Sequence, residues 1–202
     1  MQLIKLRDNI MRRNMLAVHI SWMSLAIVLT GCTPGANLAL LPSPSDNIYH
    51  LGPGDEVRVI TYDELQLSNT FTVADDGKIA FPLVGTIQAD GLTPDQLAAS
   101  ISSMLQNGKL VNQPSVSVEV ANYRPVSVLG EVNHPGQYPY QPGMTTLDAV
   151  ALAGGFTYRA VTGYAGDWRN IDPHSAPATE GKVNPGSSLQ PGDVITVFER
   201  YF

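Results

Sequence analysis

Cysteine is nearly absent from this chain of 202 residues, in which Cys32 is the only one. A single thiol excludes an internal disulfide, and it excludes the clusters of thiolates that hold structural zinc. The fold of this protein must therefore rest on its hydrophobic core. Cys32 stands at the end of an apolar N-terminal segment, so its meaning depends on the residues that precede it.

Positive charge is also scarce, and the whole chain has a formal net charge of -6. The first 31 residues hold four basic residues and one acidic residue, so the rest of the chain has 8 Lys and Arg against 17 Asp and Glu. Nucleic acids and anionic lipid headgroups are bound by clusters of basic side chains. The charge balance therefore argues against nucleic acid and anionic lipid headgroups as partners, and it does not identify a partner.

The sequence has no apolar run long enough to predict a transmembrane span. The stretch from Met15 to Leu29 is interrupted by polar residues and is shorter than the ~20 residues that a span needs. Basic residues precede it at positions 5, 7, 12 and 13. A basic segment followed by a short apolar segment is typical of an export signal. We therefore expect residues 1–31 to be a signal peptide that takes no part in the fold.

The run Leu29-Thr30-Gly31-Cys32 resembles the bacterial lipobox. That resemblance implies cleavage before Cys32, a diacylglycerol on its thiol and acylation of the new amine. Thr33, in place of an aspartate, implies sorting to the outer membrane. The alternative is a buried free cysteine behind an ordinary signal peptide. Residues 32–47 are small, polar and proline-containing, which predicts a flexible tether between the lipid and the folded body.

Short strands and one clear helix are expected in the first half of the folded chain. Apolar residues alternate over 56–62 and 115–120, and further strands are expected from residue 71 and at 79–81. Asp76-Gly77 predicts a hairpin turn between the last two. A capping box at Thr93 and Gln96 opens a helix whose apolar positions are 97, 101, 104 and 105. Gly108 is expected to end that helix.

The second half is expected to form a separate domain that begins near residue 122. A strand is predicted from Val126, a helix from about Thr146 to Ala153, a loop over 163–188 and a last strand over 194–198. One short pattern occurs twice, at residues 51–55 and 189–193, each time as Pro-Gly-Asp before a strand. The repetition predicts that the same Pro-Gly turn is used in both places.

Motifs for catalysis are missing. The sequence has no Gly-x-Ser-x-Gly elbow and no glycine-rich phosphate loop. The histidines beyond the signal segment, His50, His134 and His174, do not stand at metal-ligand spacing. The adjacent carboxylates Asp75 and Asp76 are explained by the turn at Gly77. We therefore expect no catalytic residues, no metal and no cofactor, and a protein that is not an enzyme.

Several aromatic residues remain in the folded part, and aromatic rings beside polar groups suit the binding of sugars. The same residues are common in half-buried sheets, and packing is the favoured interpretation for each. No polysaccharide-binding residue is assigned on this basis. The residues concerned are Tyr123, Tyr138, Tyr140, Tyr158, Tyr164 and Trp168.

Taken in order, these segments resemble the bacterial polysaccharide export protein family. The runs that carry the resemblance in the first half are Tyr49 to Val57, Asp76 to Gly85, Gly91 to Leu97 and Gln113 to Val118. In the second half they are Val128 to Tyr138, Thr146 to Val150 and Ala153 to Phe156, which resemble a soluble-ligand-binding β-grasp module. Each run consists mostly of turn and core residues, but their joint order behind a lipobox is specific.

The resemblance implies an α+β fold of two small domains, a polysaccharide export domain over 48–121 and a β-grasp domain over 122–202. It implies a homo-oligomeric ring that lies in the periplasm, is attached to the outer membrane and conducts exopolysaccharide or capsular polysaccharide. The implied protein partner is an inner-membrane polysaccharide co-polymerase or chain-length regulator. Long members end in an amphipathic pore helix, whereas this sequence stops directly after a strand and resembles the short members.

These observations lead us to expect a lipid-anchored component of polysaccharide export that faces the periplasm. Two alternatives stay open at this point. One is a monomeric glycan-binding or adhesion lipoprotein. The other is a periplasmic glycan hydrolase, for which the sequence offers no preferred carboxylate.

Overall fold

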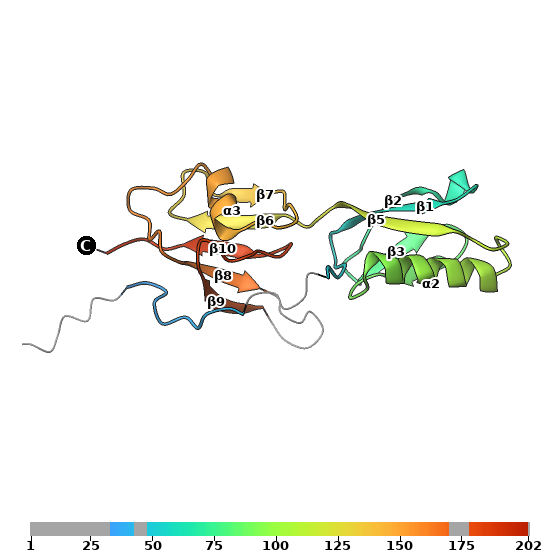
Figure 1. Ribbon diagram of the computed structural model, residues 1–202, viewed down its shortest axis with the longest axis horizontal. Coiled ribbons are helices and arrows are strands. Elements are labelled where there is room, and N and C mark those ends of the chain that lie inside the picture. The colour runs from blue at the N-terminus through green and yellow to red at the C-terminus, as the bar shows by residue number, and fades with distance from the viewer. Residues whose placement is uncertain (1–32, 43–47, 170–177, 202) are drawn as a thin grey trace, which may run out of the picture. The chain divides into compact units, whose positions relative to one another are not determined.

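The computed structural model describes residues 33–42, 48–169 and 178–201 (Figure 1). Its buried hydrophobic side chains form two separate clusters, and each cluster is enclosed by its own strands and its own α-helix. We call the part built from strands β1 to β5 the first domain, and the part built from β6 to β10 the second domain. The predicted α+β class with two small domains is confirmed.

The first domain combines a three-stranded antiparallel sheet, a two-stranded hairpin and one α-helix. The three-stranded sheet has the order β2-β1-β5, and the hairpin pairs β3 with β4. In chain order the elements are β1 (Glu56–Thr61), η1 (Leu65–Leu67), β2 (Asn69–Thr72), β3 (Lys78–Phe81), β4 (Gly85–Gln88), α2 (Pro94–Asn107) and β5 (Val116–Asn122).

The core of the first domain follows from the two periodicities in its sequence. Strand β1 buries alternate residues and exposes Arg58 and Ile60, as a half-buried strand does. Helix α2 buries one stripe, Leu97, Ile101 and Leu105. This stripe shares a cluster with the inward-facing residues of β1 and β5, namely Val57, Val59, Val116, Val118 and Val120. The predicted packing of this helix with the β5 valines is confirmed.

Both ends of α2 lie where the sequence predicted them. The amide of Gln96 donates to the Thr93 hydroxyl oxygen at 3.2 Å, and the Thr93 amide donates to the Gln96 side chain at 2.9 Å. The capping box is therefore formed. Gly108, however, has a right-handed φ of -72°, and the left-handed residue after the helix is Lys109, with φ at 53°. Gly108 directly follows the last helical residue, Asn107, so the predicted end of the helix is confirmed, while the left-handed conformation falls on the next residue.

The turn at Asp76-Gly77 forms as predicted, but it does not join two paired strands. Gly77 has a φ of 75°, and its amide donates to the carbonyl of Ala74 at 2.8 Å. The strands on either side take other partners, because β2 pairs with β1 and β3 pairs with β4. A turn fixes the direction of the chain locally, whereas strand pairing is decided by the core that both strands must cover.

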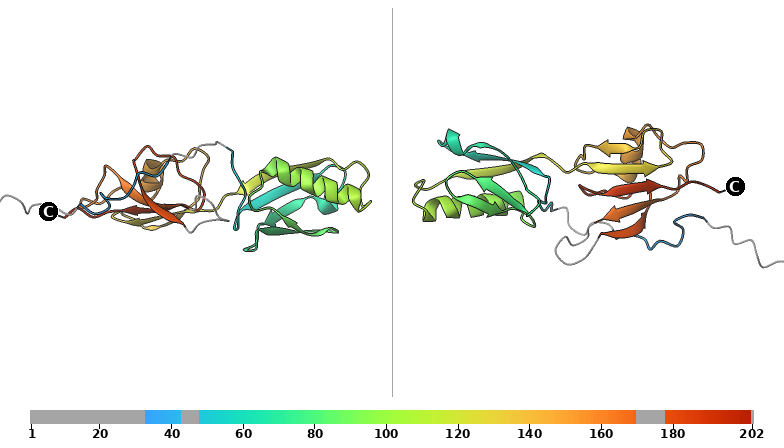
Figure 2. Two further views of the ribbon diagram at one scale, coloured as in Figure 1. Left: turned by 90° about the horizontal axis from the view of Figure 1, so that it is seen from below. Right: turned by 180° about the vertical axis from the view of Figure 1, so that it is seen from behind.

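The second domain is a five-stranded sheet with one short helix. The strand order is β7-β6-β10-β8-β9, with β10 parallel to β6 and antiparallel to β8. Figure 2 shows α3 lying against one face of this sheet. The elements are β6 (Val126–Gly130), β7 (Gly136–Tyr138), α3 (Thr146–Leu152), β8 (Ala165–Arg169), β9 (Thr179–Val183) and β10 (Val194–Val197).

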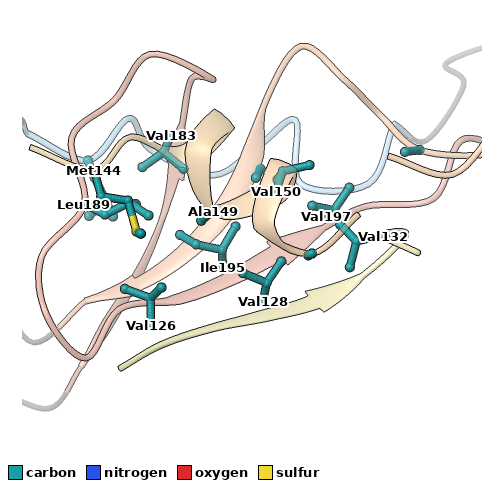
Figure 3. Close-up of a cluster of buried hydrophobic side chains, with 14 residues drawn as sticks. Val126, Val128, Val132, Met144, Ala149, Val150, Val183, Leu189, Ile195 and Val197 are labelled. Atoms are coloured by element: carbon teal, nitrogen blue, oxygen red, sulfur yellow. The ribbon is translucent and has the colours of Figure 1, made fainter. Parts of the chain in front are cut away.

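The core of the second domain lies between α3 and the sheet. Ala149 and Val150 of the helix face Val128 of β6 and Ile195 of β10 (Figure 3). Thr145 caps the helix, and the glycines at 154 and 155 follow its end with φ values of 79° and 85°. The predicted helix and its glycine ending are confirmed.

The predicted loop over residues 163–188 is wrong, because β8 and β9 lie within it. Strand β8 reads Ala-Gly-Asp-Trp-Arg and shows no apolar alternation. Its charged residues Asp167 and Arg169 are buried together with the carboxylate of Asp193, which only the folded chain brings near. The sequence therefore resembled a polar loop.

Residues 33–42 also differ from the predicted flexible tether. Leu41 is 9% exposed and belongs to the core cluster of the second domain. Its amide donates to the Lys182 carbonyl at 2.9 Å, and the Lys182 amide donates to the Ala39 carbonyl at 2.7 Å. Figure 1 shows this blue segment running beside β9. The rest of the predicted tether, residues 43–47, lies outside the described residues.

Neither α-helix within the described residues has the length and apolarity needed to cross a membrane.

Candidate functional site

The predicted lipidation residue, Cys32, lies outside the described residues, as does the predicted signal peptide. The described chain begins at Thr33, which is exposed. Pro34 follows and accepts a hydrogen bond at 2.8 Å from the Tyr164 hydroxyl of the second domain. The structure thus shows where the chain goes directly after the predicted site of acylation, while acylation itself stays a prediction.

The first of the two repeated turns buries a carboxylate. Gly54 has a φ of 93°, which a Pro-Gly type II turn requires, and it places Asp55 fully inside the protein. One carboxylate oxygen accepts from the Gly52 amide at 2.8 Å and from the Tyr49 hydroxyl at 2.5 Å. The other oxygen accepts from the Arg124 amide at 3.0 Å, and the Arg124 guanidinium lies 3.5 Å from it.

These contacts join the start of the first domain to the residues that follow β5. Burial, reinforced by the Asp55 carboxylate, raises the pKa of the Tyr49 hydroxyl. The Tyr49 ring also packs edge-on against Tyr123, with the ring centres 5.0 Å apart. With its oxygens occupied and no exposed surface, Asp55 holds structure and has no free lone pair directed at a ligand.

The second turn has the same geometry. Gly192 has a φ of 90°, and Asp193 is 2% exposed. The Gln190 amide donates to the Asp193 carboxylate at 2.8 Å, and the Asp193 amide donates to the Gln190 carbonyl at 3.1 Å. The predicted reuse of one turn is therefore confirmed, and in both copies the aspartate is buried and paired with an arginine.

The arginine of the second turn is shared between two buried carboxylates. The Arg169 Nη2 atom lies 2.7 Å from an Asp193 oxygen and 2.9 Å from an Asp167 oxygen. It also donates to the Ser188 carbonyl at 3.0 Å, and Nε donates to Asp193 at 3.1 Å. The side chains of all three charged residues are at most 5% exposed. We call Asp167, Arg169 and Asp193 the buried charge cluster.

One cation against two anions leaves the buried charge cluster short of positive charge. Burial, together with the neighbouring Asp193 carboxylate, raises the pKa of Asp167 to about 7, although Arg169 acts in the opposite direction. A carboxyl group with such a pKa is suited to acid-base work only where a substrate reaches it. Asp167 is fully buried, so its role is structural.

Metal ligation finds no support in the described part of the chain. Within residues 33–42, 48–169 and 178–201, no three side chains of His, Cys, Asp and Glu lie together as a metal site would require. His50 and His134 are both exposed, and the His134 amide donates to the Ala153 carbonyl. His174 lies outside the described residues.

The aromatic residues considered for sugar contact have separate roles. Tyr123, Tyr138, Tyr140 and Tyr164 are half-buried; the Tyr138 hydroxyl donates to the His134 carbonyl, and burial raises the pKa of Tyr140. Packing therefore accounts for these four. Tyr158 and Trp168 are exposed, by 81% and 44%.

Trp168 lies on the face of the second sheet that is opposite α3. It pairs with Val194 across β8 and β10, and Leu129 pairs with Thr196 across β6 and β10, so these side chains point away from the core. Leu129 is 45% exposed. A half-exposed indole beside aliphatic and hydroxyl groups suits contact with a sugar ring or with another protein. This face is therefore a candidate contact surface.

Comparison with known proteins agrees with the division into two domains. Residues 43–121 match the family described as "Polysaccharide biosynthesis/export protein", and residues 125–164 match the SLBB domain. The first match covers the elements β1 to β5, and the second covers β6 to α3.

Similar proteins carry names that refer to polysaccharide production and export. The "Exopolysaccharide production protein ExoF" of Rhizobium meliloti is 37% identical over 75% of this chain and 38% of its own length. The "Capsule polysaccharide export outer membrane protein CtrA" of Neisseria meningitidis is 31% identical over 60% of this chain and 32% of its own length. The "Polysialic acid transport protein KpsD" of Escherichia coli is 29% identical over 62% of this chain and 22% of its own length. The chain thus spans well under half the length of these relatives. With both domains matched in order, it belongs to the bacterial polysaccharide export protein family.

Proposed function

We propose that this protein is a component of exopolysaccharide or capsule export at the outer membrane. The observation that carries the proposal is the ordered pair of domains, an export domain followed by an SLBB domain, shared with relatives named for exopolysaccharide production and capsule export. The acidic composition agrees with a partner other than nucleic acid. The polymer itself is the proposed cargo.

The proposed mechanism is architectural and includes no bond-breaking step. Among the described residues, Asp167 is the one acidic side chain whose pKa is strongly raised. It is buried and cannot reach a glycan. We propose that several copies of the chain assemble into a conduit, and that an inner-membrane polysaccharide co-polymerase or chain-length regulator delivers the polymer to it. A monomer that only binds glycan would need no such assembly, so the size of the purified particle separates the two functions.

Loss of the gene is expected to stop secretion without stopping synthesis. In the deletion strain, polymer should be missing from the medium, while the transfer of sugars onto the lipid-linked precursor continues. The measurement is the amount of polymer in the medium and of precursor in the cell, with the wild-type gene returned on a plasmid as the control. Normal secretion by a deletion strain that has no second copy of the gene would remove the export proposal.

We propose that Cys32 carries the lipid anchor. Cys32→Ala should leave the chain uncleaved or free of lipid, because a thioether-linked diacylglycerol needs the thiol. Fractionation should then find the variant outside the outer membrane, where the wild type is expected, since stable anchoring takes two or more acyl chains. Thr33→Ser is the matched control and should fractionate as the wild type does. Outer-membrane retention of Cys32→Ala would contradict the anchor.

A further inference from the structure

The segment directly after the proposed lipid anchor is built into the second domain. Residues 34–41 contact that domain at three successive places, and we call this segment the strap. At its start, the Pro34 carbonyl accepts from the Tyr164 hydroxyl at 2.8 Å, and Gly35 lies against the ring of Phe198. Gly35 has a φ of 71°, so a side chain here would be strained as well as blocked by that ring.

The middle of the strap pairs with the outer edge of β9. Leu40 forms a parallel bridge with Lys182, flanked by two backbone hydrogen bonds of 2.9 Å and 2.7 Å. Strand β9 is the last strand of the five-stranded sheet, so its outer side would otherwise present unpaired backbone groups. The strap therefore closes a sheet edge.

The end of the strap enters the core. Leu41 is 9% exposed and packs with the buried side chains of the second domain. The close approach depends on Gly181, because a Cβ atom at that position would overlap the Leu41 side chain. Backbone pairing and side-chain burial thus act on the same short segment, which a flexible tether would not do.

We infer that the strap ties the lipid to the second domain and so holds that domain, and not the first, against the membrane surface. The inference rests on the proposed acylation of Cys32. Two peptide units separate Cys32 from Pro34, a reach of about 7 Å even when fully extended. Along the chain the first domain begins only after the strap and residues 43–47, and its last strand continues through residues 123–125 into the second domain. The surface that the second domain contacts near the strap is therefore a lipid surface.

Fluorescence quenching in membranes tests this placement. Because the Cys32 thiol is consumed by the lipid and no other cysteine is present, one introduced cysteine can be labelled selectively. The exposed positions are Thr162→Cys in the second domain and Gln106→Cys in the first. The labelled, acylated full chain is reconstituted into vesicles of phosphatidylethanolamine and phosphatidylglycerol that carry a nitroxide on the headgroup. Strong quenching is expected at residue 162 and little at residue 106.

Two insertions of equal length provide the matched control. A Gly-Ser segment between Thr33 and Pro34 preserves every strap contact and lengthens only the link to the lipid, so most of the quenching at residue 162 should be lost. The same segment after Ser45 lies beyond the strap and should leave that quenching unchanged. Both variants keep the folded domains intact, which circular dichroism checks.

Each other outcome overturns the inference. Equal quenching at the two positions, stronger quenching at residue 106, or sensitivity only to the insertion after Ser45 would show that the strap does not set the distance to the membrane. A chain that fails to bind the vesicles at all would overturn the lipid anchor together with this inference. A bound chain with the reversed pattern would overturn the inference alone.

Discussion

Arg169→Met is expected to lower the free energy of unfolding of the second domain by about 3–5 kcal/mol, the cost of removing one partner from a buried ion pair. Methionine fills much of the same volume but leaves the Asp167 and Asp193 carboxylates facing each other without a cation. It also removes the donor to the Ser188 carbonyl. Since a small domain is stable by only about 5–15 kcal/mol, this is a large share of the total.

Urea denaturation followed through Trp168 measures this effect, because Trp168 stands between Asp167 and Arg169 and the only other tryptophan lies in the predicted signal peptide. Arg159→Met is the matched control in the same domain. Arg159 pairs with Glu199 at the surface, where its side chain is 44% exposed, so its loss should cost about 0–1 kcal/mol. Equal costs for the two substitutions would mean that the buried charge cluster does not determine the stability of the second domain.

The stability of the second domain is expected to fall as the pH rises from about 4 to about 7. The pKa of Asp167 is raised to about 7 in the folded protein by burial and by Asp193, from an ordinary value of 3.8. Between these two pH values the folded state holds a proton that the unfolded state has released. The free energy of unfolding therefore falls as the pH rises. A shift of this size corresponds to about 4 kcal/mol at 1.36 kcal/mol per pKa unit. Above pH 7 the effect should level off.

Asp167→Asn isolates this contribution. The amide keeps the shape of the carboxyl group and cannot ionise, so the variant should match the wild type near pH 4 and exceed it in stability at pH 8. All other titratable groups are the same in both proteins, so the difference between the two stability curves isolates the contribution of residue 167. Parallel curves from pH 4 to 8 would show that Asp167 is ionised throughout, and that the cluster tolerates both negative charges.

Local sequence signals determined most of the first domain. The capping box at Thr93, the stripe at Leu97, Ile101 and Leu105, and the alternation around Val118 each follow from the geometry of a single helix or strand. Such signals involve residues within a few positions of one another, so the sequence displays them directly. The repeated Pro-Gly-Asp turn belongs to the same class, because φ values near 90° at Gly54 and Gly192 are a local requirement.

The tertiary structure decided what those local signals could not. Strand β8 was missed because the partners that allow Asp167 and Arg169 to be buried are distant, with Asp193 lying 24 residues beyond Arg169. The pairing of β2 with β1, and not with β3, depends on which strands cover the shared core. Apart from the repeated turn, no local pattern around Asp55 predicts that its carboxylate is buried.

The segment after the predicted anchor shows the same division most clearly. By composition, residues 33–42 are a tether, since small residues and prolines form neither a helical nor a strand pattern. The folded chain nevertheless supplies a free edge at β9, a glycine at 181 and a space in the core for Leu41. None of these lies near the segment in the sequence. The sequence by itself determined the family, the two domains and their local turns, because these depend on neighbouring residues; the buried charges and the strap required the fold, because their partners are distant along the chain.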